Sequence, residues 1–338
     1  MRKTALLLLL LLMPALNAFS QQTERLKVGL VLGGGGAKGA AEVGVLKAIE
    51  ESGIPIDYIA GTSIGSIIGG LYAVGYRSAD LDTLFRSQEW LGLLMDQKEE
   101  FKDELFKQED GVTYVLGIPI YRSKNSKNKK GESGFQFPDL ANIGAVRGDN
   151  IVALLNSMVK QPDSINFDSL PIPFRCVAVD VKQMSEKVLS QGNLPLCMRA
   201  SMAIPGMFKP VKMGEQVLVD GGVMNNLPVD VVRAMGADVV IAVDLTQNKR
   251  ENKDVEYSTG TQGRVLGMVE WFLSRPDRTK YNENRTQADV YINPDLGTYD
   301  VMSFSNAAVA DMISMGERAG KQALPELKLL HKRVLQGK

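Results

Sequence analysis

The sequence predicts an α/β fold, a three-layer α/β/α sandwich built on a mostly parallel central sheet. Short apolar runs typical of buried strands alternate with helix-like segments near the N-terminus and again in the last third of the chain. Strands joined through helices run parallel, and helices then cover both faces of the sheet. With 338 residues, 44% of them hydrophobic, the chain can bury one large core.

Charge and residue counts exclude several classes of function. The chain has 39 basic and 39 acidic side chains, so no net charge attracts it to nucleic acid. Its histidine and two cysteines, His331, Cys176 and Cys197, lack the spacing of a zinc site, and no calcium-loop pattern is present. We therefore expect no metal, no cofactor and no nucleic-acid partner.

The two cysteines leave two alternatives open. A disulfide between them would suit an oxidising compartment. Cys176, however, falls in the strand-like "PFRCVAVDV" and Cys197 in a helix-like stretch, which favours two buried free thiols.

The first twenty residues have the pattern of a secretory signal peptide. Arg2 and Lys3 precede an apolar run over residues 5–16, and small residues flank Phe19 before an expected cleavage near Ser20–Gln21. A permanent membrane anchor is the weaker alternative, because the run is short for a transmembrane helix. We expect residues 1–20 to be removed and the protein to be periplasmic, associated with the outer membrane, or secreted.

The pattern of glycines and apolar residues predicts the N-terminal elements in order. A strand at "KVGLVL" leads through a glycine-rich turn into a helix, and a strand at "DYIAG" leads into the apolar helix "IGSIIGGLYAVG". Residues 78–110 are amphipathic and helix-like, and "VTYVLGIPIY" is strand-like. The Lys-rich stretch near 121–134 predicts a mobile surface loop. "GDNIVALLNSMV" then predicts a helix capped by Asp149 or Asn150.

The second half of the chain returns to strand and helix alternation. "PFRCVAVDV" and "EKVLSQG" alternate like paired strands, "LPLCMRASMA" is helix-like, and "QVLVDGG" is a strand that ends at two glycines. "PVDVVRAMG" and "DVVIAVDL" follow as helix and strand. After a polar gap come a helix near 268–274, the strand "DVYINP" and a long terminal helix. We assign 26–245 to the main domain, and 246–338 to an extension that packs on it.

The glycine loop after the first strand has two interpretations. Gly34, Gly36 and Gly39 form a G-x-G-x-x-G pattern between a strand and a helix, as in dinucleotide-binding folds. Such folds also need an acidic residue at the far end of the second strand. Asp57 begins that strand instead, so the nucleotide interpretation lacks its second anchor.

The far end of the second strand carries "GTSIG", with Ser63 between Gly61 and Gly65. A Gly-x-Ser-x-Gly that joins a strand to a helix makes a sharp turn that exposes the serine oxygen, as a nucleophile requires. The alternative is a glycine-rich helix start with Ser63 as its cap. A serine nucleophile needs a base, usually histidine, but His331 lies near the C-terminus in an amphipathic helix, where we expect it to be solvated.

A carboxylate can replace the missing histidine. In "VLVDGG", Asp220 ends an apolar strand and precedes Gly221 and Gly222. We expect its side chain at the C-terminal edge of the sheet, where functional groups gather in α/β folds. The alternative is an ordinary Asp-Gly turn.

The motifs "GGGGAKG", "GTSIG", "RASMAIPGMF" and "DGG", in this order from Val28 to Leu245, resemble those of the patatin-like phospholipase family and of its exported bacterial members. The resemblance implies a serine–aspartate dyad in which Ser63 is the nucleophile and Asp220 the base, and which hydrolyses acyl esters of lipids. It also implies an oxyanion hole at Gly34, Gly35 and Gly36. Lys38 stands where many relatives have arginine. The supporting motif residues are Lys38, Gly39, Gly61, Gly65, Gly221 and Gly222.

The implied chemistry is consistent with elementary physical chemistry. Attack on an ester creates a negative oxygen, which bare backbone amides at a helix N-terminus can bind. An aspartate in water has a pKa of about 3.9, so burial must raise that pKa or the oxyanion hole must supply much of the acceleration. We expect activity without a titration near about 6.5, the value of a free histidine.

These inferences predict an exported phospholipase A or general lipid acyl hydrolase that contacts a membrane peripherally. "WLGLLM", residues 90–95, is a candidate interfacial lid or a piece of core, and Lys124, Lys127, Lys129 and Lys130 are a candidate phosphate-attracting patch. The alternatives are an esterase or thioesterase acting on soluble acyl groups, a nucleotide-binding protein and a non-catalytic lipid-binding module.

Overall fold

A mixed sheet of eight strands forms the centre of the computed structural model, which describes residues 25–96, 144–160, 164–247 and 278–337. The strand order is β12-β11-β1-β2-β5-β10-β9, and β6 also pairs with β5. The strands are β1 (Val28–Leu32), β2 (Tyr58–Thr62), β5 (Phe174–Asp180), β6 (Ser185–Leu189), β9 (Val211–Met213), β10 (Gln216–Asp220), β11 (Val239–Val243) and β12 (Val290–Ile292).

Five neighbouring strands, β12, β11, β1, β2 and β5, run parallel, whereas β6, β9 and β10 pair antiparallel. Every residue of β1 and β11 is buried, as expected for parallel strands with helices on both faces. The predicted pairing of "PFRCVAVDV" with "EKVLSQG" is confirmed as β5 against β6.

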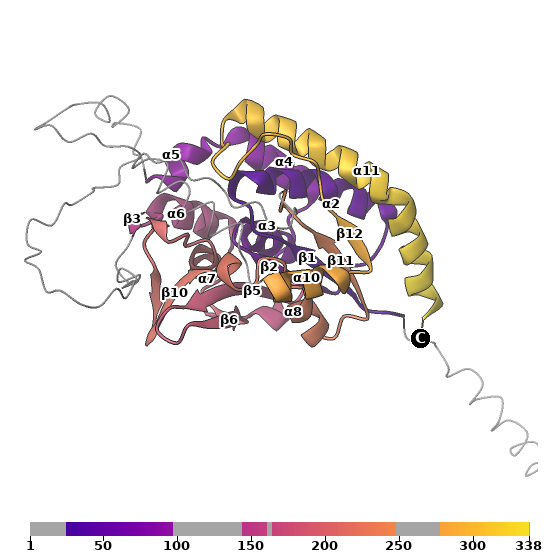
Figure 1. The fold of residues 1–338 in the computed structure, drawn as a ribbon, viewed down its shortest axis with the longest axis horizontal. Helices are drawn as coiled ribbons and strands as arrows, with labels where there is room; N and C mark the ends of the chain where they lie inside the picture. The colour runs from indigo at the N-terminus through magenta and orange to yellow at the C-terminus, as the bar shows by residue number, and fades with distance from the viewer. Residues whose placement is uncertain (1–24, 97–143, 161–163, 248–277, 338) are drawn as a thin grey trace, which may run out of the picture.

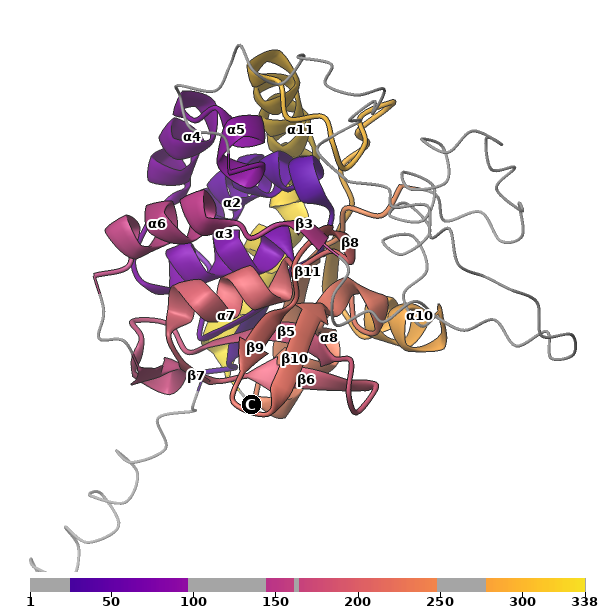
Figure 2. The same cartoon turned by 90° about the vertical axis from the view of Figure 1, so that its left-hand side faces the viewer.

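Helices cover both faces of the sheet and complete three layers (Figures 1 and 2). Leu30 and Leu32 of β1 join a large core with the helices of one face, and Val31 joins a smaller core with the other face, because successive side chains of a strand point to opposite sides. The first face carries α2 (Ala40–Ser52), α3 (Ile64–Ala73), α4 (Ser78–Ser87), α7 (Leu194–Ser201) and α11 (Asn306–Gln336); the second carries α8 (Val229–Ala234) and α10 (Arg278–Thr286). The predicted fold class is confirmed.

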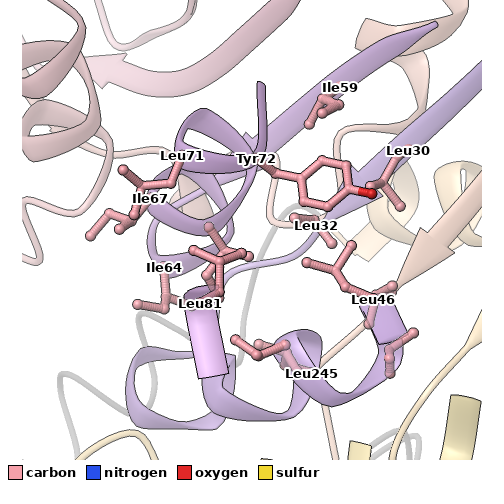
Figure 3. Close-up of a cluster of buried hydrophobic side chains, with 14 of the residues drawn as sticks. Leu30, Leu32, Leu46, Ile59, Ile64, Ile67, Leu71, Tyr72, Leu81 and Leu245 are labelled. Atoms are coloured by element: carbon pink, nitrogen blue, oxygen red, sulfur yellow. The ribbon is translucent and has the colours of Figure 1, made fainter. Parts of the chain in front are cut away.

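Apolar side chains from β1, β2, α2, α3 and α4 meet on the first face (Figure 3). Leu30, Ile59, Leu46, Leu71 and Leu81 are almost fully buried there. This core holds the start of α3, and with it the predicted nucleophile turn, against the sheet.

The long helix α11 packs along α2, and both cross the same face of the sheet (Figure 1). The two helices approach closely at glycines: a Cβ on Gly44 would lie 2.1 Å from Ile313 O, and one on Gly316 would lie 1.9 Å from Ala41 O. With β12 in the sheet as well, the described residues from 278 onward share the sheet and core of the preceding part. Within the described ranges, no helix is long and apolar enough to span a membrane.

Short elements complete the fold. They are η1 (Gly36–Gly39), α5 (Trp90–Leu94), β3 (Gly144–Val146), α6 (Asp149–Met158), β4 (Ile165–Asn166), η4 (Phe167–Ser169), β7 (Gln191–Gly192), β8 (Gly206–Phe208) and η5 (Gly221–Val223). β3 pairs with β8, and β4 pairs with β7.

The predicted cap of α6 is wrong. Gly148, at φ 72°, is the N-cap, and the carboxylate of Asp96 accepts hydrogen bonds from the amides of Gly148 at 2.7 Å and Asn150 at 3.0 Å. The capping group is thus supplied by a residue distant in sequence, which a local pattern does not reveal.

Other elements differ from the sequence prediction for local reasons. The predicted helix from residue 78 ends at Ser87, and α5 begins at Trp90. The prediction missed α10 because its residues are almost all polar. Four predictions fall outside the described residues: the signal peptide, a strand at "VTYVLGIPIY", a Lys-rich loop and a helix near 268–274.

Both cysteines are buried free thiols, as predicted. Burial raises the pKa of the Cys197 thiol to about 12 and that of Cys176 well above its usual range. These thiols are therefore protonated at neutral pH and poor nucleophiles.

Candidate active site

Ser63 lies at the turn between β2 and α3, in a backbone conformation that non-glycine residues seldom adopt, with φ 55° and ψ −124°. Such strain at a strand-to-helix turn is typical of a nucleophile elbow. The two flanking glycines are required sterically: a Cβ on Gly61 would lie 2.3 Å from Gly65 O, and one on Gly65 would lie 2.3 Å from Leu32 O. The backbone can make this turn only with glycine at both positions.

Ser201 of α7 holds this turn in place, and the sequence analysis missed it. The amide of Ser63 donates to Ser201 Oγ at 3.0 Å, and that hydroxyl donates to Val177 O of β5 at 2.6 Å. Ser201 is fully buried. The only signal in the sequence was its place within "RASMAIPGMF".

Strand β2, which ends just before Ser63, and strand β10, which ends at Asp220, both pair with β5, and their C-terminal ends meet there. Thr62 of β2 pairs in parallel with Val177, and Asp220 of β10 pairs antiparallel with Ala178, the next residue. Because β6 occupies the other edge of β5 over Cys176–Asp180, β2 and β10 share one edge. The two chain turns therefore leave the sheet at the same point.

Asp220 thus lies beside the C-terminal end of β2, at the edge of the sheet where its side chain was expected. The direction of its strand was not predicted, because β10 runs antiparallel to β5. Asp220 reaches the serine because β10 points towards the end of β2. Gly221 allows the chain to turn there, since a Cβ on it would lie 2.3 Å from Val177 O.

The carboxylate of Asp220 is fully buried. Burial raises its pKa to about 6, while hydrogen bonds from the Ser63 hydroxyl and the Gly222 amide act in the opposite direction. The Gly222 amide donates to Oδ1 at 2.7 Å. Oδ2 has no hydrogen bond of good geometry among the described residues, so the contact with Ser63 is loose, as is common for catalytic groups without bound substrate.

The glycine loop faces Ser63, since a Cβ on Gly34 would lie 3.2 Å from Ser63 Cβ. Its amides differ in availability: the Gly34 amide donates to Asn226 O at 3.1 Å. No acceptor for the amides of Gly35 and Gly36 is found among the described residues. Of the three amides predicted to donate to the oxyanion, that of Gly34 therefore already donates to Asn226 O. The amides of Gly35 and Gly36 stay candidates for the oxyanion hole.

Asn226 ties the loop to the segment after Asp220. Its side-chain Nδ2 donates to Gly34 O at 3.1 Å, so the two residues are joined by two hydrogen bonds. Thr62 Oγ1 also donates to Asn225 O at 2.8 Å. These asparagines, which follow "DGG" in sequence, hold the serine turn, the glycine loop and the Asp220 turn as one unit, and the sequence analysis did not identify them.

Two further motif residues have structural positions beside the site. Gly39 lets η1 pack on α3, because a Cβ there would lie 2.2 Å from Ile64 Cγ1. Lys38 is half-buried on η1, and its amide donates to Gly35 O at 3.3 Å.

An apolar pocket that is partly open to solvent lies beside Ser63. Apart from Ser63 its lining is apolar, and it comes from Gly36 of the glycine loop, from α3 and α5, and from the segments 202–208 and 301–304. Trp90 and Leu94 are buried in its wall, so "WLGLLM" packs in this structure as core and pocket wall. The four lysines of the predicted patch lie outside the described residues.

His331 is far from this site. It is half-buried, and its Nδ1 lies 3.0 Å from Ser52 O, at the C-terminal end of α2. The glycine loop is at the other end of that helix of 13 residues, about 20 Å away at 1.5 Å per residue. His331 therefore cannot be the base, although it is less solvated than expected.

Residues 30–233 match the family model described as patatin-like phospholipase. The chain is 29% identical over 321 residues to lysophospholipase nte1 of Aspergillus niger, covering 89% of this chain and 18% of that protein. It is 35% identical over 221 residues to patatin-like phospholipase domain-containing protein 6 of Mus musculus, covering 64% of this chain and 13% of that protein. The chain thus spans less than a fifth of the length of either relative.

Among solved structures, VipD from Legionella pneumophila superposes with a TM-score of 0.46 at 16% sequence identity, covering 89% of this chain and 67% of that one. ExoU from Pseudomonas aeruginosa, in its complex with SpcU, superposes with a TM-score of 0.41 at 15% identity, covering 92% of this chain and 53% of that one.

Proposed function

The chain belongs to the patatin-like phospholipase family, and we propose that it is an exported lipid acyl hydrolase of the phospholipase A type. The observation that carries the proposal is the position of Ser63, which lies beside a fully buried carboxylate of raised pKa and on the wall of an apolar pocket. Two relatives, which are named as a lysophospholipase and a patatin-like phospholipase domain-containing protein, support a lipid ester as the substrate.

In the proposed reaction, Ser63 Oγ attacks the ester carbonyl carbon while Asp220 takes the hydroxyl proton. Asp220 then gives this proton to the leaving alcohol, and the acyl group stays on Ser63. Water then attacks the acyl carbon while Asp220 takes a proton from it; the bond between Ser63 Oγ and the acyl group breaks, the fatty acid leaves, and Asp220 returns the proton to Ser63 Oγ. A carboxylate with a pKa of about 6 is a better base than one of ordinary pKa, because proton transfer is most efficient when the pKa lies near the working pH.

The amides of Gly35 and Gly36 are the proposed donors to the negative oxygen of the tetrahedral intermediate. Loss of one oxyanion donor typically raises the barrier by about 3 kcal/mol. With a carboxylate as the only base, this electrostatic contribution is a large part of the proposed acceleration. The rigid attachment of the loop through Asn226 keeps these amides oriented before substrate binds.

Export rests on the signal-peptide pattern of residues 1–20, which lie outside the described residues. Expression of the full chain in bacteria should yield a protein that begins near Gln21 in the periplasm, the outer membrane or the medium. A cytoplasmic product that keeps its first twenty residues, identified by N-terminal mass spectrometry, would contradict export.

An active-serine fluorophosphonate probe and fatty-acid release from phospholipid vesicles test the enzymatic proposal. We expect wild type to be labelled on Ser63, Ser63→Ala to be neither labelled nor active, and Asp220→Asn to fold but lose nearly all activity. Ser157→Ala, which changes an exposed serine of α6, is the matched control and should behave as wild type.

Three outcomes would support the alternatives. Turnover of soluble acyl esters or thioesters, but not of vesicles, would support an esterase or thioesterase. A wild-type protein that binds vesicles without labelling would support a non-catalytic lipid-binding module. A rise in melting temperature with NAD or ATP, unchanged in Ser63→Ala, would support nucleotide binding.

A further inference from the structure

One wall of the pocket beside Ser63 is built by the segment Val301–Phe304, between β12 and α11. Val301, Met302 and Phe304 line the pocket and are half-buried. The segment lies outside residues 30–233, the part of the chain that matches the family model. The pocket therefore combines family motif residues with a wall from the C-terminal extension.

Hydrogen bonds fix the shape of this wall. Asp300 Oδ1 accepts from the Met302 amide and from Ser303 Oγ, both at 2.9 Å, and the Phe304 amide donates to Met302 O at 2.8 Å. Ser305 then caps α11 by accepting from the Ala308 amide at 3.2 Å. The side chains of Met302 and Phe304 are thus presented from an ordered turn.

The same segment is attached to the glycine loop. The Ala37 amide donates to Val301 O at 3.0 Å. Gly36, at φ +57°, touches this carbonyl so closely that a Cβ on it would lie 2.5 Å from Val301 O. The wall is therefore attached directly to the loop that carries the candidate oxyanion amides. The acyl chain of an ester whose carbonyl oxygen bound to those amides would lie beside this wall.

We propose that Met302 and Phe304 determine which acyl chain the site accepts. Their side chains limit the length and width of the pocket, and they provide the apolar surface that a long, straight acyl chain contacts. The inference rests on the proposed function and adds to it the specificity for the acyl group. Methionine and phenylalanine suit this role because both offer large apolar contact areas without a polar group that would need a partner. A hydrophobic pocket discriminates by about 10- to 200-fold for each methylene that fits or fails to fit.

The test compares kcat/KM for palmitoyl and octanoyl p-nitrophenyl esters. Met302→Trp fills the pocket, and we expect it to lower the palmitoyl-to-octanoyl ratio by at least about tenfold. Phe304→Ala widens the pocket, and we expect it to raise kcat/KM for a methyl-branched acyl ester relative to the straight-chain ester. Leu329→Trp is the matched control, since Leu329 is 68% exposed on α11, and should keep the wild-type ratios.

Fluorophosphonate labelling of each variant separates the two proposals. If wild type is neither labelled nor active, the proposed function fails. If wild type and variants are labelled but both selectivity ratios stay within about twofold of wild type, the proposed function stands and this inference is wrong. Should Met302→Trp fail to fold, the Phe304→Ala ratio alone decides the inference.

Discussion

At the scale of single residues, Asp220 shows how burial produces a base. The carboxylate is fully buried and keeps one good hydrogen bond, from the Gly222 amide. Burial disfavours its charged form more than its two hydrogen-bond donors favour it, so its pKa is raised to about 6. A serine–aspartate dyad requires either such a rise or a strong oxyanion hole, and in the structure the pKa of Asp220 is raised.

The raised pKa changes the expected pH dependence of activity. The absence of a histidine base predicts no titration near about 6.5, but a base with a pKa of about 6 must titrate close to that value. We now expect kcat/KM for a soluble ester to rise with pH through an apparent pKa of about 6 and to level off above it.

His331→Gln is the control for this profile. Because His331 lies beside Ser52 at the far end of α2, the variant should keep the wild-type inflection. Loss of the inflection in His331→Gln would show that the histidine, and not Asp220, titrates.

The same pKa makes a prediction about stability. A carboxyl whose folded pKa lies above its unfolded pKa binds more protons when folded, so it lowers stability as pH rises from its unfolded to its folded pKa. Wild type should therefore lose about 2 to 3 kcal/mol relative to Asp220→Asn between about pH 4 and pH 6.

Urea unfolding of both proteins across this pH range measures the difference. A constant difference in the free energy of unfolding would mean that Asp220 does not titrate near 6. Asp230→Asn is a useful comparison with the opposite sign. Burial alone would raise the pKa of Asp230, but hydrogen bonds from Lys280 and Asn225, together with the charge of Lys280, outweigh burial and lower it.

At the scale of elements, the site depends on two strands that meet end to end on a third. The sequence predicted β2, β5 and β10 from their apolar runs, and it identified Ser63 and Asp220 from glycines around each residue. It did not predict that β10 runs antiparallel, because strand order and direction arise from contacts between distant segments and not from local patterns. The roles of Ser201 and Asn226 were missed for the same reason.

Ser201 offers a test of how the link between the Ser63 turn and β5 supports the site. Ser201→Ala removes the acceptor of the Ser63 amide and the donor to Val177 O. Unpartnered buried groups of this kind cost about 1 to 3 kcal/mol each. We expect lower stability in urea unfolding and a lower kcat with little change in KM, because the pocket is kept while the serine turn loosens.

Ser66→Ala is the matched control for Ser201→Ala. Ser66 is also fully buried, and its hydroxyl also serves a backbone group of the turn, Ser63 O at 2.6 Å, but it does not bridge to β5. A kcat loss in Ser66→Ala as large as in Ser201→Ala would contradict a special role for the link to β5.

At the scale of the whole molecule, the predicted main domain, 26–245, and the predicted extension, 246–338, contribute to the same sheet and the same large core in their described residues. β12 extends the sheet at β11, and α11 covers α2. The alternation of apolar strands and helices was enough to predict the fold class. The pocket wall at Val301–Phe304 was not predictable, because its few apolar residues follow a turn and have no period of their own.

The close packing of α11 on α2 provides a test of whether the two predicted parts fold as one unit. The Cβ that Gly316→Ala adds would lie 1.9 Å from Ala41 O, so the two helices must separate. We expect a loss of about 1 to 3 kcal/mol of stability in a single unfolding transition, whereas Arg318→Ala, on the exposed side of α11, should be close to neutral. Two separate transitions would contradict one folding unit.

The most direct test of the central claim is the site of acylation. Brief reaction with a palmitoyl ester, followed by acid quench, intact-protein mass spectrometry and peptide mapping, should find one palmitoyl group, on Ser63, in wild type and much less in Asp220→Asn. An acyl group on any other residue, or undiminished ester turnover by Ser63→Ala, would contradict the account.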